Sequence, residues 1–145
     1  MTNNPEGYVE ATVVDIVGVD KIGFAVTLAS KEDFPKFLNL SIGASEALHI
    51  AQILESAEQS RPLTNTLLNN ITTALGAEFI NSQIEDIVAG VFHAKVFYKF
   101  DGGILEFDAR ASDAIILAMI NNQTILVSNF VLKVLGIDKK EYKLK

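Results

Sequence analysis

The amino-acid sequence predicts an α+β fold: a single compact domain, residues 1–145, built from two βββα repeats. An extra helix is expected after the first repeat, and a short strand plus a helix after the second. Three observations support this prediction. The length suits one domain with a substantial core. β-branched and alternating segments indicate strands, and stretches with helical apolar spacing separate them. The octapeptide ASEALHIA returns 67 residues later (113 − 46) as ASDAIILA, which indicates a duplication.

The first repeat is predicted to span residues 8–57. Tyr8–Val19 is rich in β-branched residues and is expected to form a long strand. A short connection leads into Ile22–Ser30, which predicts a hairpin, and Phe37–Gly43 is expected to be the third strand. The next segment has helical spacing, with an apolar stripe formed by Ala47, Ile50, Ala51, Leu54 and Ala57. His49 falls on the polar side of this helix and is predicted to lie at the surface.

The extra helix is predicted in the segment SRPLTNTLLNNITTALG. Thr64 is a suitable N-cap residue, and Gly76 is a suitable stop at the C-terminal end. The apolar face of this helix is expected to consist of Leu67, Leu68, Ile71 and Leu75.

The second repeat is predicted to span residues 78–121. Glu78–Val88 and the alternating segment Gly90–Phe100 are expected to be strands, and Ile104–Arg110 is expected to be the third strand. A helix is predicted over Ser112–Asn121. The short strand TILVS and the terminal helix NFVLKVLG complete the predicted elements.

The turn between the last two strands of this repeat decides which side chains pair. A turn at Gly102–Gly103 is predicted, because it places Leu105, Phe107 and Ala109 together on the apolar face. The resulting register sets Lys99 opposite Glu106, Phe97 opposite Asp108 and Lys95 opposite Arg110.

Composition narrows the range of functions. The net charge of −6 argues against high-affinity, non-specific binding of nucleic acid. Apolar residues make up 49% of the chain and the mean hydropathy is +0.28, which indicates a large core or an apolar subunit interface. No run approaches the roughly 18 apolar residues of a membrane helix, and no export segment is recognised, so a cytoplasmic location is expected. The absence of cysteine excludes disulfides and thiolate metal sites.

The repeated octapeptide has a structural explanation. Ser45 and Ser112 are predicted to cap the two helices. Glu46 and Asp113 then lie in the first helical turns, where the helix dipole favours a negative charge. In this interpretation the octapeptide is a helix start that is used once in each repeat.

The second copy differs from the first in the residues that precede it. Asp108 and Arg110 lie on one face of their strand, and Asp113 follows three residues later. Two carboxylates flanking a guanidinium can position a phosphate, or hold a divalent cation that bridges to one. The alternative interpretation is a self-satisfied Asp–Arg–Asp network that fixes the corner between strand and helix. The residues alone leave both interpretations open.

Four segments stand out together: IGASEALHIAQILE (Ile42–Glu55), RPLTNTLLNNI (Arg61–Ile71), HAKVFY (His93–Tyr98) and DARASDAIILA (Asp108–Ala118). In this order and spacing they resemble the bifunctional nuclease (BFN) domain family, from about residue 8 to residue 137. The resemblance implies a compact α+β domain that often self-associates, and here a homodimer is expected. It also implies the nuclease activity on DNA and RNA that is reported for some plant members.

The resemblance can be carried over residue by residue. The family's IGxxEA is matched by Ile42, Gly43, Glu46 and Ala47. Its RPLTHDL is matched at the start by Arg61, Pro62, Leu63 and Thr64, and at the end by Leu67. Its DxRPSDA is matched by Asp108, Arg110, Ser112, Asp113 and Ala114, with Ala111 in place of the proline. The histidine–aspartate pair at the centre of RPLTHDL is replaced here by Asn65 and Thr66.

This replacement bears directly on activity. A histidine can serve as general base, general acid or metal ligand, and an aspartate can hold the histidine or the metal. Asn65 cannot titrate, and Thr66 has no charge. If the lost pair is the chemistry of the family, this chain is impaired or non-catalytic. If the carboxylate–arginine corner is the chemistry, it survives here.

Two hypotheses follow. The first is hydrolysis of phosphodiester bonds in DNA or RNA with the help of Mg²⁺ or Mn²⁺, and it requires the fold to bring the two helix starts together. Its candidate catalytic positions are Glu46, Asp108, Asp113 and Asn65, of which the three carboxylates are also candidate metal ligands. Its candidate substrate-binding residues are Arg61, Arg110 and Ser112. The second is a non-enzymatic, dimeric binding or regulatory module with the same fold.

Overall fold

The computed structural model describes residues 6–19, 21 and 23–143. The strands of this part are β1 (Tyr8–Val19), β2 (Gly23–Ser30), β3 (Phe37–Ile42), β4 (Glu78–Val88), β5 (Val91–Phe100), β6 (Gly103–Arg110) and β7 (Thr124–Ser128). The helices of this part are α1 (Ala44–Leu54), α2 (Thr64–Ala74), α3 (Ala111–Ile120), α4 (Asn129–Leu135) and α5 (Lys139–Lys143). None of these helices is long and apolar enough to cross a membrane.

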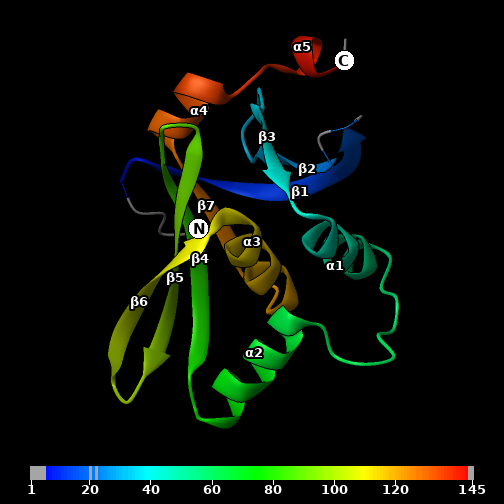
Figure 1. Ribbon diagram of the computed structural model, residues 1–145. Helices are drawn as coiled ribbons and strands as arrows, with labels where there is room; N and C mark the ends of the chain where they lie inside the picture. The colour runs from blue at the N-terminus through cyan, green and yellow to red at the C-terminus, as the bar shows by residue number, and fades with distance from the viewer. Residues whose placement is uncertain (1–5, 20, 22, 144–145) are drawn as a thin grey trace.

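The strands form one mixed sheet with the order β3-β2-β1-β7-β4-β5-β6 (Figure 1). β7 is antiparallel to β1 and parallel to β4, so it joins the three strands of the first repeat to the three strands of the second. Within each repeat the neighbouring strands are antiparallel, and a helix follows the third strand. The α+β class and the arrangement as two βββα units with added elements are therefore confirmed.

Most predicted elements agree with the structure to within one residue at each end. The first helix is shorter than predicted. Its apolar stripe was expected to extend to Ala57, but the helix ends at Leu54. Ile22, where the second strand was expected to start, lies outside the described residues. Gly76 follows the end of α2 with φ of 93° and donates its N–H to the carbonyl of Thr73, as a glycine stop does. The short helix α5 was not predicted; the ring of Tyr142 in it stacks on Phe37 at 4.4 Å.

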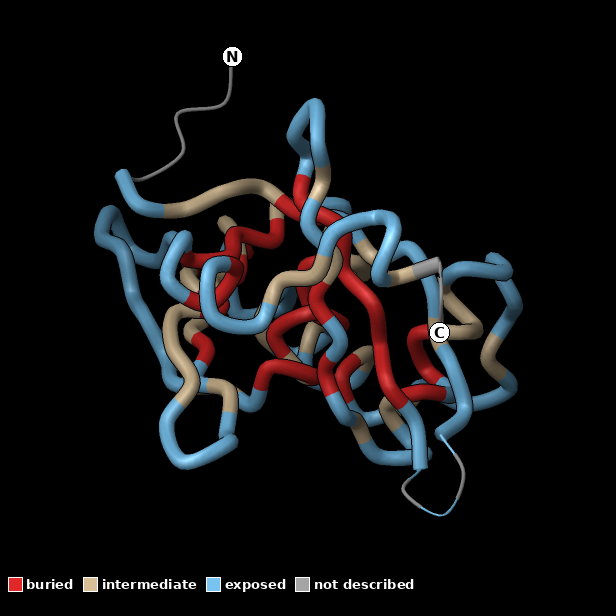
Figure 2. The backbone as a smooth tube through the Cα atoms, turned by 90° about the horizontal axis from the view of Figure 1, so that it is seen from above, coloured by how far each residue is buried: buried red, intermediate tan, exposed pale blue. Residues whose placement is uncertain are grey.

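The centre of the core is α3. Seven of its ten residues are buried, as expected for a helix that is apolar on all sides. It packs on β4 and β5 and contacts both α1 and α2. Figure 1 shows α3 between the two repeats, and Figure 2 shows buried segments gathered in the interior. Because α1 and α3 pack against each other, the two copies of the repeated octapeptide become neighbours.

The register of the β5–β6 hairpin differs from the prediction by two residues. The turn lies at Asp101–Gly102, where both residues have positive φ (50° and 79°), as a type I′ turn requires. The observed pairs are Lys99 with Ile104, Phe97 with Glu106, Lys95 with Asp108 and His93 with Arg110. The predicted pairs of Lys99 with Glu106, Phe97 with Asp108 and Lys95 with Arg110 are therefore wrong. The physical reason is that aspartate tolerates the left-handed conformation, so Asp-Gly can occupy the two central positions of the turn.

The apolar face predicted for α2 is exposed rather than buried. Its exposed fractions lie between 42% and 72%, for Leu67, Leu68, Ile71 and Leu75. The structure describes every residue of α2, and among these residues Asn65 alone is buried. Leu105 and Phe107 of β6 are also exposed, although the sequence predicted that they face the core. α2 and β6 therefore each present apolar side chains that the domain itself does not cover.

We expect the exposed face of α2 to be the contact surface of the predicted homodimer. α2 contains no charged residue, so two copies can approach through it although each chain has a net charge of −6. An Ile71→Glu substitution places a charge on this face, and it is expected to reduce the mass measured by light scattering from dimer to monomer. Phe130→Glu is the matched control, because Phe130 is an exposed apolar residue of α4. Equal behaviour of the two variants would contradict this assignment of the surface.

Candidate functional site

A single guanidinium joins the starts of the two repeated helices. Arg110 ends β6 and occupies the N-cap position of α3. Its Nε and Nη2 atoms donate to Asp113 Oδ2 and Oδ1 at 2.7 and 3.0 Å. Its Nη1 atom lies 2.9 Å from Glu46 Oε1. Asp113 belongs to the first turn of α3 and Glu46 to the first turn of α1, so the fold does bring the two helix starts together.

The cluster consists of Glu46, Arg110 and Asp113. It differs from the predicted Asp–Arg–Asp network in one residue. The sequence suggested that Arg110 lies between Asp108 and Asp113. In the structure the second carboxylate is that of Glu46, from the other repeat. Asp108 lines a separate shallow hollow with Glu85, Lys95 and Arg110, among other residues. An internal ion-pair network is therefore present. It connects the two repeats and does not only fix the corner between β6 and α3.

The helix starts are built differently from the prediction. The N-cap residues of α1, α2 and α3 are Gly43, Leu63 and Arg110, and none of them caps its helix with a side-chain hydrogen bond. The predicted capping roles of Ser45, Thr64 and Ser112 are therefore wrong, because each lies one or two positions inside its helix. Glu46 and Asp113 do occupy the first turns, where the helix dipole favours their negative charge.

Gly43 has a specific role in placing Glu46. Its backbone is extended, with φ of −74°, so any residue could adopt it. A Cβ atom at this position, however, would lie 2.8 Å from Glu46 Oε2. The absence of a side chain at Gly43 therefore lets the carboxylate of Glu46 fold back over the helix start, where it meets Arg110.

Asn65 connects α2 to this cluster. Its Nδ2 atom donates to Asp113 Oδ1 at 2.9 Å, and Asn65 is buried. The residue that replaces the histidine of the family motif thus contacts the candidate catalytic carboxylate directly. Beside it lies a polar hollow of about 250 Å³, lined by Ser45, Glu46, His49, Leu63, Thr64, Asn65, Arg110, Asp113 and Ile116.

His49 lines the same hollow, and the prediction that it lies at the surface is wrong. It is only 3% exposed, and its Nε2 atom lies 3.2 Å from both Gln59 Nε2 and Thr66 Oγ1. At His49 the polar side of α1 faces the start of α2 instead of solvent. A signal was present in the sequence, because His49 is three residues after Glu46 and so shares its helix face.

The charges of the cluster are stabilised by their neighbours. Burial raises the pKa of Asp113, but the hydrogen bonds from Arg110 and Asn65 and the charge of Arg110 outweigh burial and hold this pKa below its usual value. The hydrogen bonds and charge of Asp113, with a smaller contribution from Glu46, raise the pKa of Arg110. Arg110 and Asp113 therefore stay ionised at neutral pH. Burial lowers the pKa of His49, so its imidazole is neutral there.

The remaining predicted residues lie around this hollow or away from it. Ser112 is buried and lines a neighbouring hollow that also contacts Gly43, Glu46 and Arg110. Arg61 is exposed in the connection between α1 and α2 and does not line the polar hollow. Among the described residues, no group of three or more His, Asp or Glu side chains is close enough to hold a metal ion. The three carboxylates predicted as metal ligands therefore do not form a preformed site.

Fold and site together define a class of protein: an α+β domain of two βββα repeats whose helix starts are joined by a carboxylate–arginine–carboxylate cluster. The chain belongs to the bifunctional nuclease domain family, because the family model described as "Bifunctional nuclease domain" matches residues 26–140. It is also similar to the uncharacterized proteins MT1877 and Rv1829 from two strains of Mycobacterium tuberculosis. Each is 33% identical over 112 residues, which is 77% of this chain and 66% of the relative. The chain thus spans about two thirds of the length of these relatives.

Proposed function

We propose that this chain hydrolyses phosphodiester bonds of DNA or RNA at the polar hollow. The observation that supports the proposal is the bridging of Glu46 and Asp113 by Arg110 at the edge of the hollow. A guanidinium has five N–H donors. Three contacts to the carboxylates leave two donors (5 − 3), and the side chain is 67% exposed, so these two can bind a phosphate oxygen.

The two carboxylates are suited to different roles. Both oxygens of Asp113 accept hydrogen bonds, from Arg110 and Asn65, so Asp113 positions the guanidinium. Glu46 is bonded to Arg110 through Oε1, and its Oε2 atom is the proposed proton acceptor. The oxygen of a water molecule forms a bond to phosphorus while the bond to the leaving ester oxygen breaks. Glu46 takes the proton of this water and returns it to the leaving oxygen.

A divalent cation does not fit the cluster as it is arranged. Glu46 and Asp113 are both bonded to Arg110, so a cation there has to displace a guanidinium. Asp108, the third predicted ligand, lines a different hollow. No step of the proposed reaction therefore uses a cation, and the predicted dependence on Mg²⁺ or Mn²⁺ is tested separately.

The decisive assay uses single-stranded and double-stranded DNA and RNA with the parent protein and with Asp113→Ala. Cleavage by the parent is expected to fall by on the order of 10²-fold in Asp113→Ala, because the phosphate-binding guanidinium loses its support. Asp33→Ala is the charge-matched control, since Asp33 lies in an exposed loop. Parallel reactions with Mg²⁺, Mn²⁺ or EDTA test the cation dependence. Cleavage that is equal in all three proteins would indicate a contaminating nuclease and would contradict the proposal.

A second candidate function is a non-enzymatic binding module, and one observation favours it. Asn65 already donates a hydrogen bond to the carboxylate of Asp113, so the cluster can have the purely structural role of holding the two repeats together. This function predicts that the parent cleaves none of the four substrates and that Arg110 variants lose stability but no activity. The same assay therefore separates the two candidates.

A further inference from the structure

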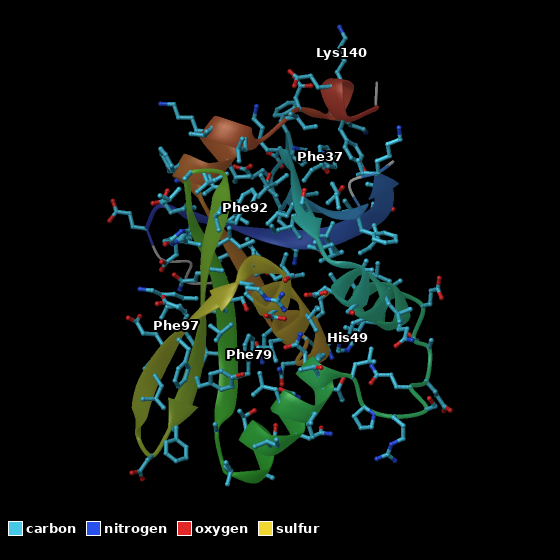
Figure 3. The ribbon with its side chains drawn as sticks, in the orientation of Figure 1. Phe37, His49, Phe79, Phe92, Phe97 and Lys140 are labelled. Carbon is cyan, nitrogen blue, oxygen red and sulfur yellow. The ribbon has the colours of Figure 1, made fainter. Side chains whose placement is uncertain are left out.

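His49 joins three segments around the polar hollow. It projects from α1, and its Nε2 atom contacts Gln59 in the connection after α1 and Thr66 in the first turn of α2. Figure 3 shows His49 between α1 and α2. Thr66 is next in sequence to Asn65, which holds Asp113. The imidazole of His49 therefore contacts the residue next to Asn65, and the hydrogen bond of Asn65 to Asp113 completes the cluster.

The protonation state of the ring follows from Gln59. The Oε1 atom of Gln59 accepts a hydrogen bond from the backbone N–H of Leu63 at 3.0 Å, so its amide nitrogen is directed at His49. An amide nitrogen only donates, and Nε2 of His49 must therefore accept. We accordingly assign the ring proton to Nδ1. The lone pair of Nε2 is then occupied, so His49 is poorly placed to take a proton from a substrate.

The start of α2 depends on these polar contacts. The leucine and isoleucine face of the helix is exposed, and Asn65 is its buried residue. Apolar packing therefore contributes little to the position of the first turn. The hydrogen bonds from Asn65 to Asp113 and between Thr66 and His49 fix that turn to α3 and α1.

We propose that His49 is a positioning residue: its neutral imidazole holds the first turn of α2 so that Asn65 engages Asp113, and its protonation releases this turn. The hydroxyl of Thr66 can accept a hydrogen bond from a protonated Nε2, so this contact persists. The amide group of Gln59 has to turn away from the added proton, and its Oε1 atom then no longer accepts from Leu63, the N-cap residue of α2. The hydrogen bond of Asn65 to Asp113 then weakens with it. This proposal depends on the proposed function only where its test measures the cleavage of nucleic acid.

The charged groups around His49 come from three elements. Glu46 from α1, Arg110 from β6 and Asp113 from α3 line the hollow with it. α2 has no charged residue, and the connection contributes the exposed side chains of Glu55, Glu58 and Arg61. Burial lowers the pKa of His49 in the folded protein. The contribution of neutral His49 to the free energy of unfolding is therefore fully present above the unfolded-state pKa of about 6.5. It is lost as the pH falls through the lower pKa of the folded state.

The test follows side-chain amide and imidazole signals by NMR over a pH series from about 7.5 to 5, the range in which histidine titrates. The Asn65 amide signals are expected to shift with the same midpoint as the His49 ring. His49→Gln keeps a neutral acceptor near the Nε2 position, so its Asn65 signals are expected to stay at their neutral-pH positions throughout. The Asn121 amide, which donates to Asn69 at 2.8 Å, is the internal control and is expected not to move.

Two results would overturn the proposal. One is an Asn65 signal that does not respond to the titration of His49. The other is an Asn65 signal in His49→Gln that titrates as it does in the parent. Where the parent cleaves nucleic acid, the cleavage by His49→Gln, relative to its own value at neutral pH, is also expected to persist to lower pH than that of the parent. Where the parent does not cleave, the proposed function fails, and the NMR titration still decides the role of His49.

Discussion

Replacement of Arg110 by alanine is expected to remove most of the cleavage activity and to lower stability only modestly. The substitution removes the two N–H donors proposed to bind phosphate and leaves Glu46 and Asp113 without their counter-charge. The loss of such transition-state donors typically lowers kcat by on the order of 10²–10³-fold. The guanidinium is two thirds exposed, so its ion pairs contribute about 1 kcal/mol or less to stability. Single-turnover cleavage and thermal denaturation measure the two effects separately.

Two further variants sharpen this prediction. Arg110→Lys keeps the charge but loses the planar pair of donors that contacts both oxygens of Asp113, so we expect most of the activity to be lost. Gly43→Ala keeps every charge and an acceptable backbone, but its methyl group displaces the carboxylate of Glu46. It is expected to reduce cleavage with little change in the melting temperature. Lys99→Ala, an exposed cation on β5, is the control and should cleave like the parent. Parental activity in Arg110→Ala would remove the cluster from the mechanism.

The helix starts illustrate what the sequence could predict. The repeated octapeptide predicted two equivalent helices, and pseudo-symmetry made it reasonable that their first turns meet. The partner of Arg110 could not be predicted, because alternation along β6 fixes only the face on which Asp108 lies. Whether Asp108 or Glu46 reaches the guanidinium depends on how α1 packs on α3, which is a tertiary contact.

The errors at α2 and His49 have a common physical origin. An amphipathic pattern predicts that the apolar side faces the core and the polar side faces water. α2 reverses this relation, since its leucines are exposed and Asn65 is buried. α1 departs from it as well, because its polar side meets the polar start of α2 at His49. A pattern within one helix does not distinguish water from the polar surface of a neighbouring helix.

Restoration of the family's pair, by Asn65→His combined with Thr66→Asp, is the second substitution with a large expected effect. Asn65 already donates to Asp113 Oδ1 at 2.9 Å, so the introduced imidazole can donate to the same carboxylate. Its other nitrogen then faces the hollow as a proton acceptor that the parent lacks. A general base at such a position typically contributes about 10²–10⁴-fold to the rate. We expect cleavage to rise by at least about 10-fold, measured on the same four substrates as the parent.

The single substitutions show which half of the pair matters. Thr66→Asp alone places a carboxylate against Nε2 of His49, which accepts hydrogen bonds in the parent. The charge favours a protonated His49, so its pKa is expected to rise and the contact with Gln59 to weaken. Asn65→His alone leaves His49 undisturbed and should account for most of the gain. Equal cleavage by the parent and the double variant would assign the chemistry to Glu46, Arg110 and Asp113. Cleavage only by the double variant would instead assign it to the lost pair, and the parent chain would then be the binding module.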